Sequence, residues 1–336
     1  MFSCFVAKAL LRRVVSDFDI LISNLVVTAS HVRKHAMKNI ILITGMILGT
    51  AGIALADFDS DMLAASALQG EKKYDEAIQA WINIGDSCQD PEQQYAAIRK
   101  AAECTRLNKG GEAKALEICG HIKTEPYAKA CRAHVYQWSA AYSNILAEFE
   151  SVDFSGWPED LSSIGYRVRA QAYFYTNNGG GAAHDYLKAF QCSKHFDKWT
   201  SLRMLGNTYL KLLDDELKAE ACFRKCISDC GGGHPGLSAK VDLVNLLMSQ
   251  KRYEEALQCL SGDKHGGSWE VTLTALEGKV YAASGKKNEA IASYEKALKT
   301  YGIMPHQQKE YEKALTELKG ALPQPPPNPD KKEPGK

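Results

Sequence analysis

The chain has 336 residues, of which 45% are hydrophobic, and its 41 Lys and Arg nearly balance its 40 Asp and Glu. A net charge of +1 gives no electrostatic reason to expect nucleic acid or an anionic membrane surface as the partner. The length suits two ordinary domains or one elongated array.

The N-terminal region carries the pattern of a bacterial secretory signal peptide that begins at Met37. Lys38 supplies a positive start, the run from Ile40 to Ala56 is uncharged, and its small residues Ala54 and Ala56 precede Asp57. A positive start, an apolar core and an Ala-x-Ala site are the three parts of such a signal. We therefore expect residues 37–56 to be cleaved after Ala56. The mature protein would be periplasmic or secreted, without membrane insertion.

Residues 1–36 mix charged and apolar residues without a clean period. We interpret them as a non-structural or mis-assigned extension upstream of a true start at Met37. A competing interpretation keeps Met1 as the start and makes residues 40–56 an uncleaved inner-membrane anchor. That run is slightly short for a membrane span, which needs about 20 residues.

Residues 57–322 form a single helical body in this interpretation. Segments of helical period are separated by Gly, Asn or Pro, and no strand alternation is visible. Four pairs of helices in the second half of the chain recur about every 34 to 37 residues, a period typical of helical solenoids. They are marked by Ala170, Tyr173, Ala182, Tyr186 and Ala189; Leu205, Gly206, Tyr209, Ala219, Phe223 and Cys226; Leu243, Leu247, Tyr253, Ala256 and Leu260; and Leu276, Gly278, Tyr281, Ala290, Tyr294 and Ala297.

Packing explains why this pattern predicts stacked hairpins. Gly278 and Ala290 allow two antiparallel helices to approach closely, and Tyr281 and Tyr294 fill the space between successive pairs. No pair can bury its apolar face alone, so neighbouring pairs must stack.

The ends of the body follow the pattern less closely. A first pair lies around residues 60–85, and residues 86–162 are degenerate, with helices expected near Pro91–Leu107, Gly111–Ile122 and Pro126–Glu150. A last helix, from Pro305 to Ala321, places Tyr311, Ala314, Leu315 and Leu318 on one face, as a capping helix would. The Pro-rich residues 323–336 have little apolar surface to bury and are expected to be disordered or polyproline-II-like.

At these residues the chain resembles the tetratricopeptide repeat family, strongly over residues 163–300 and fairly over 60–85. The resemblance implies a right-handed helical-hairpin solenoid of about six repeats. It also implies a protein or peptide partner, held in a concave groove lined by the first helix of each pair. The matching groove positions are Arg167, Gln171, Tyr175, Arg203, Asn207, Lys211, Asn245, Met248 and Lys279. An ordinary polar surface is the alternative for these positions.

Amide and cationic side chains in such a row suit an extended peptide, because amides satisfy backbone groups and cations take carboxylates. Asn207 and Asn245 are similar in position to the asparagines of carboxylate-clamp members of the family. The full clamp is not reproduced, so the resemblance leaves a C-terminal carboxylate ligand open.

Ten cysteines are many for this length, and nine remain after the expected cleavage. Cys119 and Cys131 flank a predicted turn and are the best-placed pair for a disulfide in an oxidising compartment. Buried cysteines that act as small hydrophobic residues are the alternative. Cys222, Cys226 and Cys230 share one helical stripe, but their spacing is not that of a recognised metal site, and we expect neither a metal nor a cofactor.

The sequence contains no GxSxG, GK[ST] or HExxH motif, so we expect no enzyme activity. The function predicted from the sequence is that of an exported scaffold for protein–protein interaction. A thiol-rich redox or metal-binding envelope protein and a membrane-anchored spacer remain the alternatives.

Overall fold

The computed structural model describes residues 53–193, 197–230, 233–262 and 266–320. Over these ranges the chain forms fifteen α-helices, one short 3-10 helix and no strand, which confirms the all-α prediction. The extension 1–36, most of the signal peptide and the tail 323–336 lie outside the described residues. Residues 53–56, which end the predicted signal, begin the first described helix.

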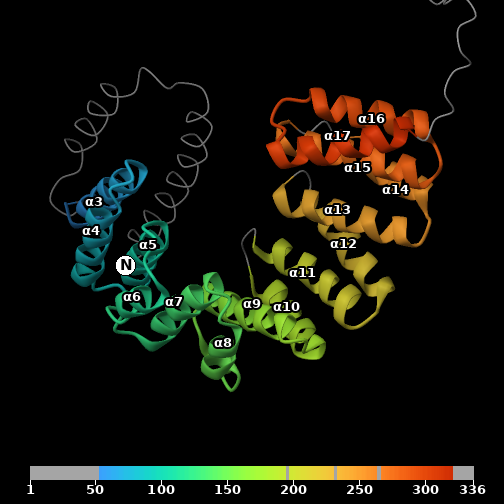
Figure 1. The fold of residues 1–336 in the computed structure, drawn as a ribbon. Coiled ribbons are helices and arrows are strands. Elements are labelled where there is room, and N and C mark those ends of the chain that lie inside the picture. The colour runs from blue at the N-terminus through green and yellow to red at the C-terminus, as the bar shows by residue number, and fades with distance from the viewer. Residues whose placement is uncertain (1–52, 194–196, 231–232, 263–265, 321–336) are drawn as a thin grey trace, which may run out of the picture.

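Consecutive helices pair into hairpins that follow one another along a curved array (Figure 1). The pairs are α3 (Ile53–Gly70) with α4 (Tyr74–Ser87), α5 (Pro91–Leu107) with α6 (Glu112–Cys119), α7 (Glu125–Trp138) with α8 (Tyr142–Phe149), α9 (Glu159–Tyr175) with α10 (Gly179–Cys192), α11 (Asp197–Leu212) with α12 (Glu216–Cys230), α13 (His234–Ser249) with α14 (Tyr253–Leu260), and α15 (Ser268–Ala283) with α16 (Lys287–Lys299). The 3-10 helix η1 (Phe154–Gly156) precedes α9, and α17 (Pro305–Gly320) follows the last pair.

The described part of the chain thus holds seven pairs, one more than the six that the sequence indicated. The additional pair is α7–α8, because the predicted helix Pro126–Glu150 breaks after Trp138. The break contains Ala140, whose φ is +56°. The stacked arrangement itself agrees with the predicted solenoid.

Every hairpin turn contains one residue in the left-handed region of backbone conformation. These residues are Lys72, Lys109, Ala140, Asn177, Asp214, Lys251 and Gly285, spaced 31 to 37 residues apart. In most of these turns, the next residue donates its N–H to a carbonyl five residues earlier, as when Ala141 bonds to Tyr136 at 2.9 Å. This geometry satisfies carbonyls at the end of the first helix and reverses the chain, as in a Schellman motif.

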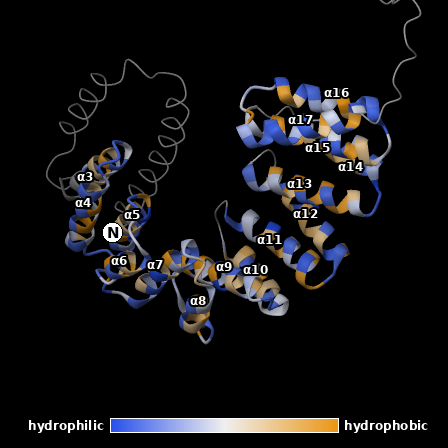
Figure 2. Ribbon diagram, in the orientation of Figure 1, coloured by the Kyte–Doolittle hydropathy of each residue, from blue (hydrophilic) through white to orange (hydrophobic). Residues whose placement is uncertain are grey.

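Close approach within a pair depends on small residues, as the sequence predicted. A Cβ atom at Gly206 would lie 2.6 Å from the ring of Phe223, and one at Gly278 would lie 3.2 Å from the ring of Tyr294. Each helix has an apolar side that faces its neighbours and a polar side that faces solvent. Hydrophobic and hydrophilic residues therefore alternate along the helices in Figure 2.

The last helix packs as a cap. Tyr311 is buried against Tyr294 and Ala297, and Ala314, Leu315 and Leu318 pack on the same cluster. This confirms the stripe predicted for the helix that begins at Pro305. Among the helices that the structure describes, none combines the length and apolarity needed to cross a membrane.

Candidate functional site

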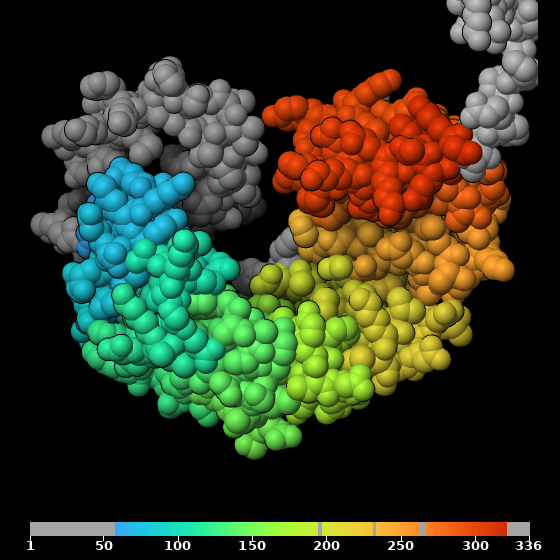
Figure 3. Space-filling model, in the orientation of Figure 1, coloured from blue at the N-terminus to red at the C-terminus, as the bar shows by residue number. Residues whose placement is uncertain are grey.

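The first helices of successive hairpins line the inside of the curve. Each contacts the next, in the order α5, α7, α9, α11, α13 and α15. Their paired second helices lie toward the outside of the arc in Figure 1, and Figure 3 shows the same arc in space-filling form. We call the solvent-facing side of these six first helices the inner face.

A patch of amide and tyrosine side chains is formed by residues of the first helices α7 and α9 together with Tyr142, the first residue of α8. Gln137 Nε2 donates a hydrogen bond of 2.5 Å to Gln171 Oε1. The rings of Tyr142 and Tyr175 stack with centroids 4.5 Å apart and planes 15° apart. Tyr175 is nevertheless 56% exposed. We call Gln137, Tyr142, Gln171 and Tyr175 the amide–tyrosine patch. It joins two of the predicted groove residues, Gln171 and Tyr175, to two residues that the sequence did not single out.

Other predicted groove residues are tied to the neighbouring hairpin. Arg203 Nε donates to Asp242 Oδ2 at 2.6 Å, and Asn207 Nδ2 donates to the same oxygen at 3.1 Å. Asn207 is only 5% exposed. Lys279 Nζ pairs with Glu310 Oε1 at 2.9 Å. Each of these three residues therefore already uses at least one donor within the chain.

The remaining predicted positions differ in exposure. Lys211 and Asn245 are exposed, whereas Met248 is half-buried and packs against the core of hairpins α9 to α15. Arg167 is half-buried, and its Nε is a buried donor with no acceptor among the described residues.

Sequence reasoning missed a group of residues on α5 and α7, next to Arg167. Arg106 lies over the ring of Trp138, with Cζ 5.8 Å from the ring centroid, and the ring of His134 meets the Trp138 ring edge-on at 6.2 Å. Arg99 lies over Tyr95, with Cζ 6.0 Å from the centroid. These residues fall in the degenerate segment 86–162. Their helical spacing, with Arg106 seven residues after Arg99 and Trp138 four after His134, was the available signal.

The electrostatic setting of His134 is positive. Burial lowers the pKa of His134 to about 4, and Arg99, Arg167 and Arg106 lower it further, against a raising effect of Glu103. The imidazole is therefore neutral at pH 7, and the positive charge at this place belongs to the arginines.

The cysteines of the described ranges are buried or partly buried. Cys119 and Cys131 are both buried, and their sulfur atoms lie 2.7 Å apart. Burial raises the pKa of Cys222 to about 11 and that of Cys226 to about 12, so both are protonated thiols at neutral pH. No group of three or more His, Cys, Asp or Glu side chains in the described ranges is arranged to hold a metal ion.

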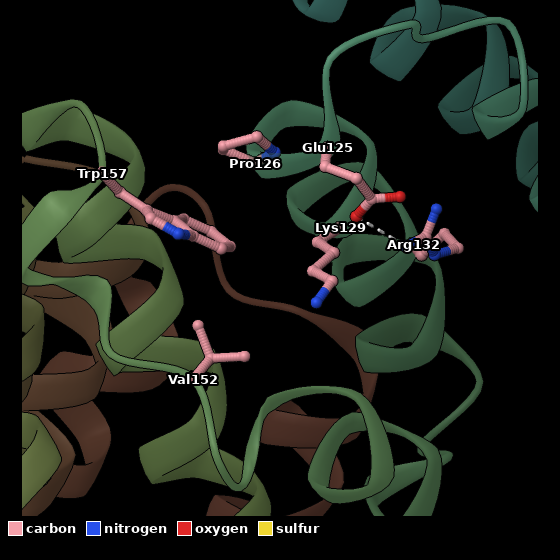
Figure 4. Close-up of a pocket in the computed structure, with 6 residues that line it drawn as sticks. All are labelled: Glu125, Pro126, Lys129, Arg132, Val152 and Trp157. Carbon is pink, nitrogen blue, oxygen red and sulfur yellow. Dashed lines mark ion pairs between the residues drawn. The ribbon is translucent and has the colours of Figure 1, made fainter.

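A surface pocket of about 430 Å³ lies beside the start of α7 and is lined by Glu125, Pro126, Lys129, Arg132, Val152 and Trp157. Figure 4 shows Trp157 and Val152 on one side and the charged side chains of α7 on the other. Arg132 pairs with Glu125 at 3.6 Å and also with Glu148. The guanidinium of Arg132 is therefore already matched by two acids.

Comparison with known proteins places the resemblance in the second half of the chain. Residues 213–319, from the turn before α12 to the end of α17, match the family described as the tetratricopeptide repeat-like domain. This confirms the predicted resemblance for that segment. No curated protein matches the sequence.

Several solved structures are similar to this chain at low identity. A tetratricopeptide repeat protein of Parabacteroides merdae is 16% identical, with 77% of this chain and 98% of that chain covered and a TM-score of 0.47. BtubC of P. vanneervenii is 17% identical, with 71% and 96% covered and a TM-score of 0.42. The human IFIT1 dimer is 20% identical, with 71% and 53% covered and a TM-score of 0.42.

Proposed function

We propose that this chain, whose residues 213–319 are tetratricopeptide repeat-like, is an exported scaffold that binds a peptide or protein segment along its inner face. The observation that carries the proposal is the amide–tyrosine patch. Tyr175 keeps more than half of its surface in solvent, and Gln171 lies beside it on the same helix. Neither side chain belongs to the hydrophobic clusters that hold the hairpins together.

The chemistry of the patch suits an extended peptide. Each glutamine has an amide oxygen and an amide N–H₂, so the pair keeps donors and acceptors free after the bond between Gln137 and Gln171. Tyrosine offers a large rigid surface and a polar hydroxyl at low entropic cost. Stacked repeats present such groups along one continuous surface, which is how solenoids bind extended partners.

Export is the second part of the proposal, and it is supported by the sequence from Met37 to Ala56. Cleavage after Ala56 would remove the first four residues of α3, Ile53 to Ala56, and leave the rest of that helix. Expression of the chain from Met37 in a Gram-negative host, followed by N-terminal sequencing, tests this part. Periplasmic protein that starts at Asp57 supports export, whereas intact Met37 in the membrane fraction supports the anchored spacer.

The binding part is tested with a C-terminally tagged protein and variants of the patch. Proteins that co-purify with the wild type are identified, produced separately and titrated against purified variants by calorimetry. We expect the double variant Gln171→Ala with Tyr175→Ala to weaken binding about tenfold or more, because exposed tyrosines commonly dominate binding energy.

A matched control keeps the result interpretable. Lys188 is exposed on α10, the second helix of the same hairpin, so Lys188→Ala should leave the affinity unchanged. Circular dichroism should show the same helicity for all variants. Unaltered binding by the double variant would remove the amide–tyrosine patch from the function.

A further inference from the structure

Three arginines from two helices surround α7 on the inner face. Arg99 and Arg106 lie on α5 and Arg167 lies on α9, while α7 contacts both helices and carries His134 and Trp138 between them. Arg106 lies over Trp138, whose ring meets that of His134 edge-on, and Arg99 lies two turns earlier on α5. Arg167 lies on α9, which contacts α7, and all three arginines lower the pKa of His134. We call Arg99, Arg106 and Arg167 the arginine cluster.

The cluster differs from every other arginine that the structure describes. Residues 53–320 contain eight arginines, all in the described ranges. Five form ion pairs with acids, namely Arg132, Arg169, Arg203, Arg224 and Arg252. The three without an acidic partner in these ranges are the three members of the cluster. Three cations without neighbouring acids repel one another. A bound anion would offset this electrostatic repulsion.

The donors of the cluster are oriented by aromatic rings. Arg99 lies over Tyr95 and Arg106 lies over Trp138, so in both cases a ring covers a face of the guanidinium. The N–H donors of a guanidinium lie in its plane, in a fork that matches the two oxygens of a carboxylate. Arg167 Nε and Trp138 Nε1 are both buried donors without an acceptor among the described residues.

The nearby acids do not neutralise the cluster. Glu103 on α5 is the acid that acts on His134, and it lies 3.3 Å from Lys100 Nζ, with which it pairs. His134 itself is neutral at pH 7 because of burial and its cationic neighbours. The local charge is therefore close to that of three guanidinium groups.

We propose that the arginine cluster binds carboxylate groups of an acidic peptide segment, and this rests on the proposed peptide-binding function of the inner face. A peptide is favoured over a nucleic acid by the surroundings of the cluster. Two members of the amide–tyrosine patch lie next to it, Gln137 on α7 and Gln171 on α9, and their amides can bond to a peptide backbone. Nucleic acids need an extended basic surface to match many phosphates, whereas this chain has a net charge of +1.

The test uses three fluorescent probes and the full chain from Met37. The probes are a ten-residue peptide that alternates Glu and Ala, the same peptide with Gln in place of Glu, and a ten-nucleotide oligothymidylate. Fluorescence anisotropy at low salt measures each affinity. We expect the Glu peptide to bind at least tenfold more tightly than both the Gln peptide and the oligonucleotide, and to weaken as salt is added.

Variants then assign binding to the cluster. Arg167→Gln and Arg106→Gln should each weaken binding of the Glu peptide about tenfold, since each removes a charge-assisted hydrogen bond. Lys188→Gln, on the second helix α10, removes one exposed cation elsewhere and should leave the affinity unchanged. Thermal unfolding is a second readout. Because the cluster repels itself, Arg167→Gln should not lower the midpoint temperature, whereas a purely structural arginine would.

The outcomes separate this inference from the proposed function. No measurable binding of the Glu peptide at low salt, or equal binding of the Glu and Gln peptides, overturns the carboxylate site. Tighter binding of oligothymidylate overturns the choice of a peptide. Neither result affects the test of Gln171 and Tyr175, which depends on the captured partner and not on charge.

Discussion

Arg203 and Asp242 lie 39 residues apart in the sequence, yet Arg203 Nε donates a 2.6 Å hydrogen bond to Asp242 Oδ2 across two successive hairpins. The same carboxylate accepts a bond from Asn207. Two residues that the sequence assigned to the groove thus help to join α11 to α13. Among the predicted groove residues and their neighbours, positive charge without an ion pair in the described ranges is left to the arginine cluster and to the exposed Lys211.

Replacement of Asp242 by asparagine should change stability and binding in opposite directions. Loss of the charge-assisted bonds to Arg203 and Asn207 should lower the free energy of unfolding by roughly 1.5–3 kcal/mol. Arg203 would then be free to attract an anion, so the Glu peptide should bind more tightly. Urea unfolding and fluorescence anisotropy measure the two effects. Unchanged stability would show that these bonds contribute little to the packing of α11 against α13.

A second ion pair is far more buried and should contribute more. Arg169 donates from Nε and Nη2 to the two oxygens of Asp185 at 2.6 and 3.1 Å, and from Nη1 to the carbonyls of Phe149 and Val152. Arg169→Met would leave the buried Asp185 carboxylate with only its 3.0 Å contact to His184 Nδ1 and should cost roughly 3–5 kcal/mol. Chemical denaturation checks this. The partly exposed Arg224 is the control, because Arg224→Met should cost less than about 1 kcal/mol.

The turn between α7 and α8 should be open to stabilisation. Ala140 has a φ of +56°, a region that costs an L-residue roughly 1–2 kcal/mol and costs glycine nothing. Glycine loses about 0.5–1 kcal/mol of this advantage through its freedom in the unfolded chain. We therefore expect Ala140→Gly to stabilise the protein by up to about 1 kcal/mol in thermal or urea unfolding. Gly285→Ala, at a φ of +81°, should have the opposite sign. Destabilisation by Ala140→Gly would contradict this account.

His134 should make stability depend on pH. Its folded-state pKa of about 4 lies below the ordinary value of 6.5 because of burial, Arg99, Arg167 and Arg106, with Glu103 opposing. Between these two values the unfolded chain binds more protons than the folded one. The stabilising contribution of the neutral imidazole is therefore complete above pH 6.5. It is lost as the pH falls toward 4, which lowers the free energy of unfolding by about 3 kcal/mol.

The variant His134→Gln isolates this effect, because glutamine does not titrate. Between pH 7 and pH 4, the free energy of unfolding of the wild type should therefore fall relative to that of the variant by about 3 kcal/mol. A constant difference over this range would show that the imidazole is not held neutral by its surroundings.

The pair Cys119 and Cys131 can be tested by counting thiols. Their sulfur atoms are 2.7 Å apart, so a disulfide needs little movement of α6 and α7. Each bond formed removes two protons and two electrons, which a disulfide-bearing oxidant accepts. Nine cysteines follow Met37. Exported protein, denatured without reductant, should show seven thiols, and Cys119→Ser should show eight. Nine thiols in the exported wild type would exclude the bond.

The fold could be predicted from the sequence where small and aromatic residues recur at fixed positions. Gly206, Gly278 and Tyr311 lie where the packing argument placed them. The sequence predicts one helix across α7 and α8 because Ala140 carries no turn signal, whereas the structure breaks the helix there with Ala140 at a φ of +56°.

The site was less predictable because its chemistry depends on contacts between hairpins. The repeat pattern predicts that Arg203 and Asn207 lie on the groove side of one helix. It does not predict that Asp242 of α13 lies against both of them, because that depends on how α11 packs on α13. The arginine cluster was missed because residues 86–162 lack the repeat pattern that would have aligned α5 with α7. Gln171 and Tyr175, two of the predicted groove positions, lie together in the amide–tyrosine patch, and their role in binding stays a prediction.

The central claim, that the inner face binds the partner, is tested most directly by site-specific photo-crosslinking in the periplasm. A benzophenone amino acid replaces Tyr175 on α9 in one protein and Leu217 on α12 in another, since Leu217 is 82% exposed on a second helix. We predict a discrete crosslinked product from position 175 that is absent from position 217. A product of equal yield from position 217, or none from position 175, would contradict binding at the inner face.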